Sequence, residues 1–185
     1  MNVIFSNSNM LRNLIRIIQV LIAAVLLSAS ASAASTLRIA FVDTGNTGRS
    51  MTAAALAQHW ANENKIKVSI ISRALALNPY NVVPEPDFEQ LLKPMDISVS
   101  GHRAAQFEKG VVTFSDFIFV MTPAHKDRIL SEFPEARSKV YLLSEYATGL
   151  PIEIQDAYGK DSAFYDTVFK QINELIPLLM KKLTN

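Results

Sequence analysis

Cysteine is absent from all 185 residues of the chain. This absence excludes a disulfide framework, a thiolate metal site, thiol redox chemistry and a lipid-modified cysteine. Histidine is scarce, and His59, His102 and His125 are dispersed, with no spacing typical of metal ligands. We therefore expect the three histidines to be structural, and we predict neither a metal site nor a cofactor.

An excess of either charge is also missing. The chain has 18 basic and 17 acidic residues, but two of the basic residues and none of the acidic ones lie before residue 34. The remainder therefore carries 16 basic against 17 acidic residues, a net charge of −1. Such neutrality gives no support for non-specific nucleic-acid binding, so we expect no nucleic-acid partner.

The chain contains no apolar run long enough to span a bilayer. Two arginines precede an apolar run at residues 17–27, which is well short of the ~20 residues that a spanning helix needs. Small residues follow, with Ala31 and Ala33 placed as in an A-x-A cleavage site. Residues 1–33 are thus predicted to be a cleavable signal peptide, with Met1 or Met10 as the start. The protein is expected in the periplasm or the medium, with no membrane span after cleavage.

Strand-like and helix-like segments alternate through residues 34–185, which predict a single domain. Strands are predicted at residues 37–42, 68–72, 117–121 and 139–143. Helices are predicted at residues 50–63 and 87–92, from residue 123 to just before residue 134, and at residues 162–183, with loops at 74–86 and 144–161. This alternation predicts an α/β fold with a four-stranded parallel sheet flanked by helices on both faces.

The segment FVDTGNTGRSM, residues 41–51, joins the first predicted strand to the first predicted helix. A strand, a tight loop and a helix N-terminus together present backbone N–H groups and the positive end of a helix dipole to an anion. Arg49 adds a planar donor suited to phosphate oxygens. Ser50 is placed to cap the helix. The segment predicts a phosphate-binding loop after the first strand, although it begins with an acid, Asp43.

Two phosphate chemistries match this loop only in part. A nucleotide-binding P-loop needs glycine where Asp43 stands and lysine where Arg49 stands. The haloacid-dehalogenase-like phosphatases use an aspartate nucleophile after a strand, as Asp43 would be, and Thr47 falls at their threonine. Gly45, however, occupies the position where most of that family carry a second acid.

A third resemblance extends from residue 37 to the final helix. The segment DTGNTGRS resembles the C-x5-R-[ST] loop of the low-molecular-weight protein tyrosine phosphatases in every feature except the cysteine. Three later segments, DISVSGHRAAQF, SDFIFVMTPAHKDRIL and IQDAYG, are similar to further motifs of that family in the same order. The last corresponds to the family's D-P-Y general-acid loop, with alanine for proline.

The resemblance implies roles for ten residues. Asp43 would stand in place of the catalytic cysteine, Asp156 would be the general acid, and Tyr158 would lie at the rim of the substrate pocket. Arg49 would bind the phosphoryl oxygens, Asn46 would brace the loop, and Ser50 would bond to the nucleophile. The implied phosphate-binding set is Thr44, Gly45, Asn46, Thr47, Gly48, Arg49 and Ser50.

Two hypotheses follow from the missing cysteine. The first is an exported pseudophosphatase that binds phosphate or a phosphorylated ligand such as phosphotyrosine. The second is an active phosphomonoesterase that uses Asp43 as nucleophile or as base for water, with Asp156 as the acid. A carboxylate in that role usually acts with a bound cation, which reduces the repulsion between the two anions.

Overall fold

The computed structural model describes residues 36–184, together with residues 12, 16, 18 and 19. The remainder of the predicted signal peptide, residues 1–33, and its cleavage site lie outside the described residues, so export stays a prediction. Thr36–Asn185 forms one compact unit. Within the described residues, no helix combines the length and the apolar character needed to cross a bilayer.

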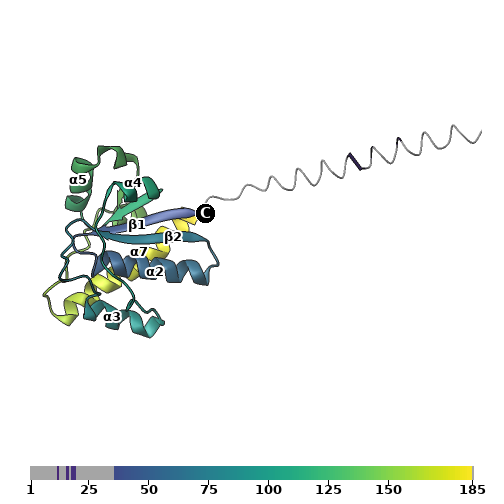
Figure 1. The fold of residues 1–185 in the computed structure, drawn as a ribbon. Coiled ribbons are helices and arrows are strands. Elements are labelled where there is room, and N and C mark those ends of the chain that lie inside the picture. The colour runs from purple at the N-terminus through teal and green to yellow at the C-terminus, as the bar shows by residue number, and fades with distance from the viewer. Residues whose placement is uncertain (1–11, 13–15, 17, 20–35, 185) are drawn as a thin grey trace, which may run out of the picture. The chain divides into compact units, whose positions relative to one another are not determined.

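Four parallel strands form the sheet, in the order β2-β1-β3-β4 (Figure 1). Their bounds are Leu37–Asp43 for β1, Val68–Ala74 for β2, Phe117–Val120 for β3 and Val140–Leu142 for β4. The strands alternate with helices along the chain, because parallel neighbours require crossover connections. The predicted parallel α/β sheet is therefore confirmed.

Helices cover both faces of this sheet. In Figure 1, α2, α3 and α7 lie on one side of it, and α4 and α5 lie on the other. The helix bounds are Arg49–Glu63 for α2, Pro86–Leu92 for α3, Lys109–Phe114 for α4, Pro123–Glu132 for α5, Leu143–Thr148 for α6 and Ser162–Thr184 for α7. Two short 3-10 helices, η1 at Lys93–Met95 and η2 at Pro134–Ser138, complete the elements of residues 36–184.

The side chains of β1 divide the apolar core into two layers. Ile39 and Phe41 belong to the cluster that also contains buried residues of α2 and α7. Ala40 and Val42 belong to the cluster on the opposite face. All four are fully buried, which explains why β1 is a continuous apolar run and does not alternate between apolar and polar residues.

Two short helices, α4 and α6, were not predicted. The predicted loop at residues 144–161 begins one residue after the start of α6, so its first part is helical. Both helices have only six residues, too short to show a clear helical period, so packing against the sheet decides their conformation.

The sheet order places the loop after β1 at a favourable position for ligands. The chain leaves β1 for β2 on one side and later returns to β3 on the other side of β1. In open parallel sheets, such a reversal leaves a crevice outside the carboxyl ends of the strands, and ligands bind there. The predicted phosphate-binding loop, which follows Asp43 at the end of β1, lies at this crevice.

Candidate functional site

The loop after β1 is organised around the side chain of Asp43. Its Oδ1 accepts a hydrogen bond from the backbone N–H of Asn46 at 2.6 Å, and its Oδ2 accepts one from the N–H of Ser50 at 2.8 Å. The residue is only 2% exposed. One carboxylate therefore ties the end of the strand to the middle of the loop and to the first turn of α2.

Asn46 and Ser50 hold the loop from behind. The amide of Asn46 donates to the Ser50 hydroxyl oxygen at 3.0 Å and accepts the N–H of Ala105 at 3.2 Å. Asn46 has a φ of 61°, a left-handed conformation that asparagine tolerates better than most residues. The prediction that Ser50 caps α2 was wrong, because the capping position is Gly48, and the first-turn N–H of Ser50 is bonded by the Asp43 carboxylate.

Arg49 connects the loop to a segment more than 100 residues later in the chain. Its guanidinium donates to the carbonyl oxygen of Ile154 at 3.0 Å and to a carboxylate oxygen of Asp156 at 2.9 Å. Arg49 is 4% exposed, whereas the side chain of Asp156 is 55% exposed. The other carboxylate oxygen of Asp156 accepts the N–H of the exposed Tyr158 at 3.2 Å. The structure thus brings the predicted general acid into contact with the arginine that is predicted to bind phosphate.

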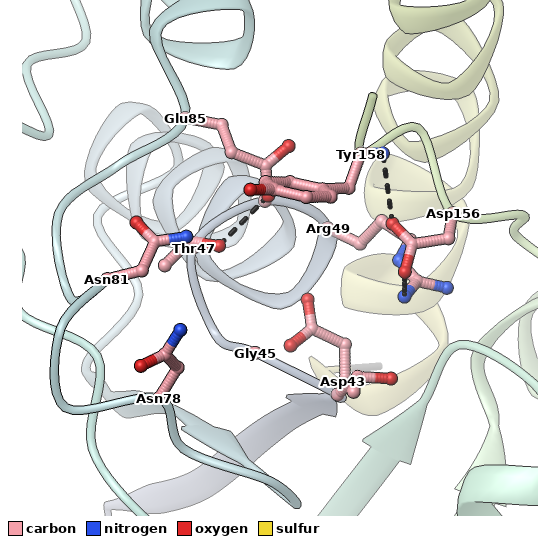
Figure 2. A pocket seen from close by; sticks show the side chains of 11 residues that line it. Asp43, Gly45, Thr47, Arg49, Asn78, Asn81, Glu85, Asp156 and Tyr158 are labelled. Carbon is pink, nitrogen blue, oxygen red and sulfur yellow. Dashed lines mark hydrogen bonds and ion pairs between the residues drawn. The ribbon is translucent and has the colours of Figure 1, made fainter. Parts of the chain in front are cut away.

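A pocket opens over this loop (Figure 2). All the predicted site residues line it except Asn46 and Ser50, which brace the loop underneath. The lining residues are Asp43, Thr44, Gly45, Thr47, Gly48, Arg49, Asn78, Asn81, Glu85, Asp156 and Tyr158. The asparagines and Glu85 come from the segment between β2 and α3, where no sequence pattern indicated a functional role.

Several backbone donors of the loop have no acceptor. Within residues 36–184, the N–H groups of residues 44, 45, 47, 48 and 49 donate no hydrogen bond. They belong to the loop and the N-terminus of α2, where the helix dipole favours negative charge. The loop therefore retains the donors expected of an anion-binding site after two of its N–H groups have bonded to Asp43.

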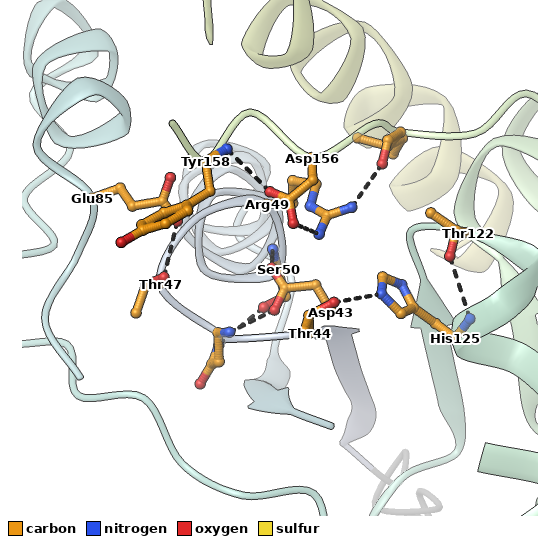
Figure 3. Close-up of polar contacts among 12 residues, drawn as sticks. Asp43, Thr44, Thr47, Arg49, Ser50, Glu85, Thr122, His125, Asp156 and Tyr158 are labelled. Atoms are coloured by element: carbon orange, nitrogen blue, oxygen red, sulfur yellow. Dashed lines mark hydrogen bonds and ion pairs between the residues drawn. The ribbon is translucent and has the colours of Figure 1, made fainter. Parts of the chain in front are cut away.

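Glu85 is a pocket residue that no sequence pattern indicated. Its carboxylate accepts a hydrogen bond from the hydroxyl of Thr47 at 2.9 Å (Figure 3). It accepts another from the hydroxyl of Tyr165 at 2.8 Å. Its own N–H donates to the Thr47 carbonyl at 2.9 Å. A Cβ atom at position 48 would lie 2.8 Å from a Glu85 oxygen, which explains glycine there. The pKa of Glu85 is raised above its usual value, chiefly because burial disfavours the charged form.

Two histidines also contact the loop. His102 Nε2 lies 2.7 Å from the carbonyl oxygen of Asn46, and His125 Nε2 lies 3.0 Å from the hydroxyl of Thr44 (Figure 3). Burial is the main cause that lowers the pKa of both residues, that of His125 to about 4. Both are consequently neutral at pH 7. Their structural role was expected, but no local pattern indicated that they support this loop.

The charges around the pocket are mostly negative. Asp43, Glu85 and Asp156 present three carboxyl groups, against the single guanidinium of Arg49 among the pocket-lining residues. In the described residues, no group of three or more Asp, Glu, His or Cys side chains is arranged to hold a metal ion. The loop donors suit an anion, while the surrounding carboxylates suit a neighbouring cation. A ligand that carries both charges would match the two features.

Comparisons with known proteins agree with this geometry. The family model described as low molecular weight phosphotyrosine protein phosphatase matches residues 38–185. A protein-arginine-phosphatase of Geobacillus stearothermophilus is 32% identical over 147 residues, which cover 79% of this chain and 95% of the relative.

Solved structures show the same fold. A mutant of YwlE from Bacillus subtilis superposes with a TM-score of 0.77 and 30% identity, covering 81% of this chain and 100% of that one. A second structure, a mutant of the arginine phosphatase YwlE with a phosphorylated active-site serine, has a TM-score of 0.76 and 30% identity, covering 80% of this chain and 97% of that one.

Replacing His125 with glutamine is expected to change how stability depends on pH. The folded state holds the His125 pKa at about 4, below its ordinary value of 6.5, because of burial and the charge of Arg49, partly offset by Asp43 and Asp156. The neutral form therefore contributes stability above pH ~6.5, and this contribution is lost as pH falls towards ~4. Over that range, the free energy of unfolding of the wild type should fall relative to His125→Gln by on the order of 2 kcal/mol.

Urea unfolding at several pH values measures this difference. The comparison with the variant cancels the contribution of Glu85, whose raised pKa acts in the opposite direction over part of the range. A difference between the two proteins that stays constant with pH would contradict the prediction.

Proposed function

Because this chain belongs to the low molecular weight phosphotyrosine protein phosphatase family, we propose that it is an exported member that binds phosphorylated ligands with little or no turnover. In this proposal, Asp43 takes the position of the family's attacking cysteine, since the chain contains no cysteine at any position. Export rests on the predicted signal peptide at residues 1–33 alone.

The observation that carries the proposal is the double hydrogen bond of the Asp43 carboxylate. Both oxygens accept loop N–H groups, at 2.6 Å and 2.8 Å, from a side chain that is almost fully buried. The carboxylate thereby occupies part of the anion site with its own charge. A bound phosphoryl group would approach this charge, and attack by the carboxylate on phosphorus would bring two anions together. These features support binding over rapid hydrolysis.

The remaining donors support a phosphoryl ligand. The N–H groups of residues 44, 45, 47, 48 and 49 have no acceptor among the described residues, and they surround the floor of the pocket. Arg49 already donates to Asp156, so a ligand oxygen would share or replace that contact. Replacement would free the Asp156 carboxylate to contact another group of the ligand.

The pocket charges favour phosphorylated arginine as the ligand. A phosphorylated guanidinium carries a negative phosphoryl group next to a positive group, and Glu85 and Asp156 stand on the wall beside the loop donors. The relative from Geobacillus is named a protein-arginine-phosphatase, which agrees with this choice. For the ring of a phosphotyrosine, the pocket lining offers one aromatic contact, the exposed Tyr158 at the rim. The uncharged ring would form no ion pair with the two carboxylates.

A specific observation also favours an active enzyme as the second candidate. Asp43, Arg49 and Asp156 all line one pocket, and the last two are in direct contact. In the related YwlE mutant, a serine oxygen of the active site carries a phosphoryl group. Attack by an Asp43 oxygen would also attach the phosphoryl group to the enzyme, here as an acyl phosphate. Asp156 would donate a proton to the leaving group, and water would later release phosphate.

A phosphatase panel separates the two candidates. Purified protein should release negligible phosphate from aryl phosphates, phosphotyrosine and phosphoarginine, with or without divalent cations. The Asp43→Cys variant should gain turnover by at least about 100-fold, because a thiolate attacks phosphorus without a metal. Adding Arg49→Ala to that variant should abolish the gain, since the phosphoryl contact is lost.

Wild-type turnover that disappears in Asp43→Asn would instead establish the second candidate. A trapped acyl phosphate on Asp43, detected by mass spectrometry, would identify its nucleophile.

Ligand preference can be measured by calorimetry with phosphoarginine and phosphotyrosine. Glu85→Gln keeps an oxygen that can accept a hydrogen bond from Thr47 or Tyr165 but removes the negative charge. It should weaken phosphoarginine binding by about tenfold relative to phosphotyrosine binding. Glu145→Gln, the same change at an exposed position of α6, should leave both affinities unchanged. If Glu85→Gln weakened the affinity for both ligands equally, Glu85 would act only by supporting the loop through Thr47, and its charge would not select the ligand.

A further inference from the structure

The outer side of β2 has backbone groups that pair with no other strand. β2 is the edge strand of the sheet, and β1 pairs with its inner side. On the outer side of β2, only Ala74 pairs with another segment of the described chain. The N–H of Ala74 donates to the carbonyl of Ala105 at 2.8 Å, and the carbonyl of Ala74 accepts the N–H of Phe107 at 2.7 Å. Because backbone groups alternate along a strand, those of Ile70 and Ser72 point to the same outer side. Within residues 36–184, neither of these two N–H groups donates a hydrogen bond outside the sheet.

A groove crosses this edge. It is lined by Ile70 and Ile71, whose side chains lie on opposite faces of the sheet and pack against different core clusters. The other walls come from α2 and from residues 98–103. A groove that contacts both faces of one strand passes over its edge. Ile70 is partly exposed along it, whereas Ser72 is buried, and the Arg73 guanidinium bonded to its carbonyl is one of the groups that cover it.

The groove carries positive charge and no acidic residue. Arg73 and Arg103 line it, and no Asp or Glu does. Arg73 donates to the Ser72 carbonyl at 2.7 Å, and Arg103 donates to backbone carbonyls at 2.6 Å and 3.1 Å. Neither guanidinium forms an ion pair with a carboxylate in the described part of the chain. His102 adds no charge at pH 7, because its pKa is lowered.

We propose that this edge of β2 binds an acidic segment of a partner protein, which adds to the sheet as an extended strand. Ile70 and Ser72 supply backbone hydrogen bonds, and the two arginines select acidic side chains. An acidic residue of the partner would draw Arg73 away from the Ser72 carbonyl, where a partner N–H would then bond. The surface is separate from the phosphate pocket, so this inference is independent of the proposed function.

The test uses the purified protein and a short peptide of alternating valine and glutamate. Binding is followed by NMR, together with hydrogen exchange at individual amides. The peptide should bind and should slow exchange of the Ile70 and Ser72 N–H groups at least about tenfold. Two control peptides should fail to bind: one with lysine in place of glutamate, and one with alternate backbone nitrogens methylated, which prevents strand pairing.

Charge reversal supplies a second measurement. The double variant Arg73→Glu and Arg103→Glu should bind the acidic peptide about tenfold or more weakly than the wild type. The affinity of the wild-type protein for this peptide should fall as salt is added. Lys170→Glu, an exposed position on α7, is the matched control and should bind as the wild type does. Circular dichroism checks that each variant is folded.

Three results would overturn the proposal. The first is no binding of the acidic peptide at about 1 mM, a very weak affinity for a specific site. The second is equal binding of the methylated peptide. The third is a dimer in analytical ultracentrifugation that protects the Ile70 and Ser72 amides without peptide, because a second copy would then be the occupant.

Discussion

The hydrogen bonds from the loop N–H groups to Asp43 are the interaction on which the site depends. They connect the end of β1, the turn at Asn46 and the first turn of α2 through one buried carboxylate. Loss of this side chain would leave two enclosed donors without a partner, which costs on the order of 1–3 kcal/mol for each. The same contacts affect the proposed ligand binding, because a carboxylate that stabilises the loop also places negative charge where a phosphoryl group is proposed to bind.

The support of this loop comes from segments distant in sequence. His102 and Ala105 contact Asn46, His125 contacts Thr44, and Glu85 contacts Thr47. The helical and strand periodicities of the sequence predict none of these contacts. The contacts result from the parallel sheet, which brings the carboxyl ends of neighbouring strands to one edge. The charge balance of the pocket follows from the same arrangement, since Glu85 and Asp156 reach it from segments that are far apart in the sequence.

Short elements show where local patterns stop being informative. The strands β1 to β4 were all predicted near their observed positions, because buried parallel strands are continuous apolar runs. The helix α5 was predicted from Pro123 to its end, since proline marks its first turn and Pro134 follows it. The six-residue helices α4 and α6 carry no such boundary signals, and only packing against the sheet and α7 selects them. Ser50 has a residue type that suits a helix cap, but its hydroxyl accepts a hydrogen bond from Asn46 within the same loop, and Gly48 takes the capping position.

The sequence by itself determined the α/β class, the number of strands, the place of the loop between β1 and α2 and the absence of cysteine chemistry. These properties depend on residue type and local spacing, which are visible without coordinates. Only the tertiary structure decided that Arg49 contacts Asp156, that Glu85 lies in the pocket, and that the Asp43 carboxylate bonds to the loop itself. Such contacts join residues up to 107 positions apart, and their distances depend on how the sheet and helices pack.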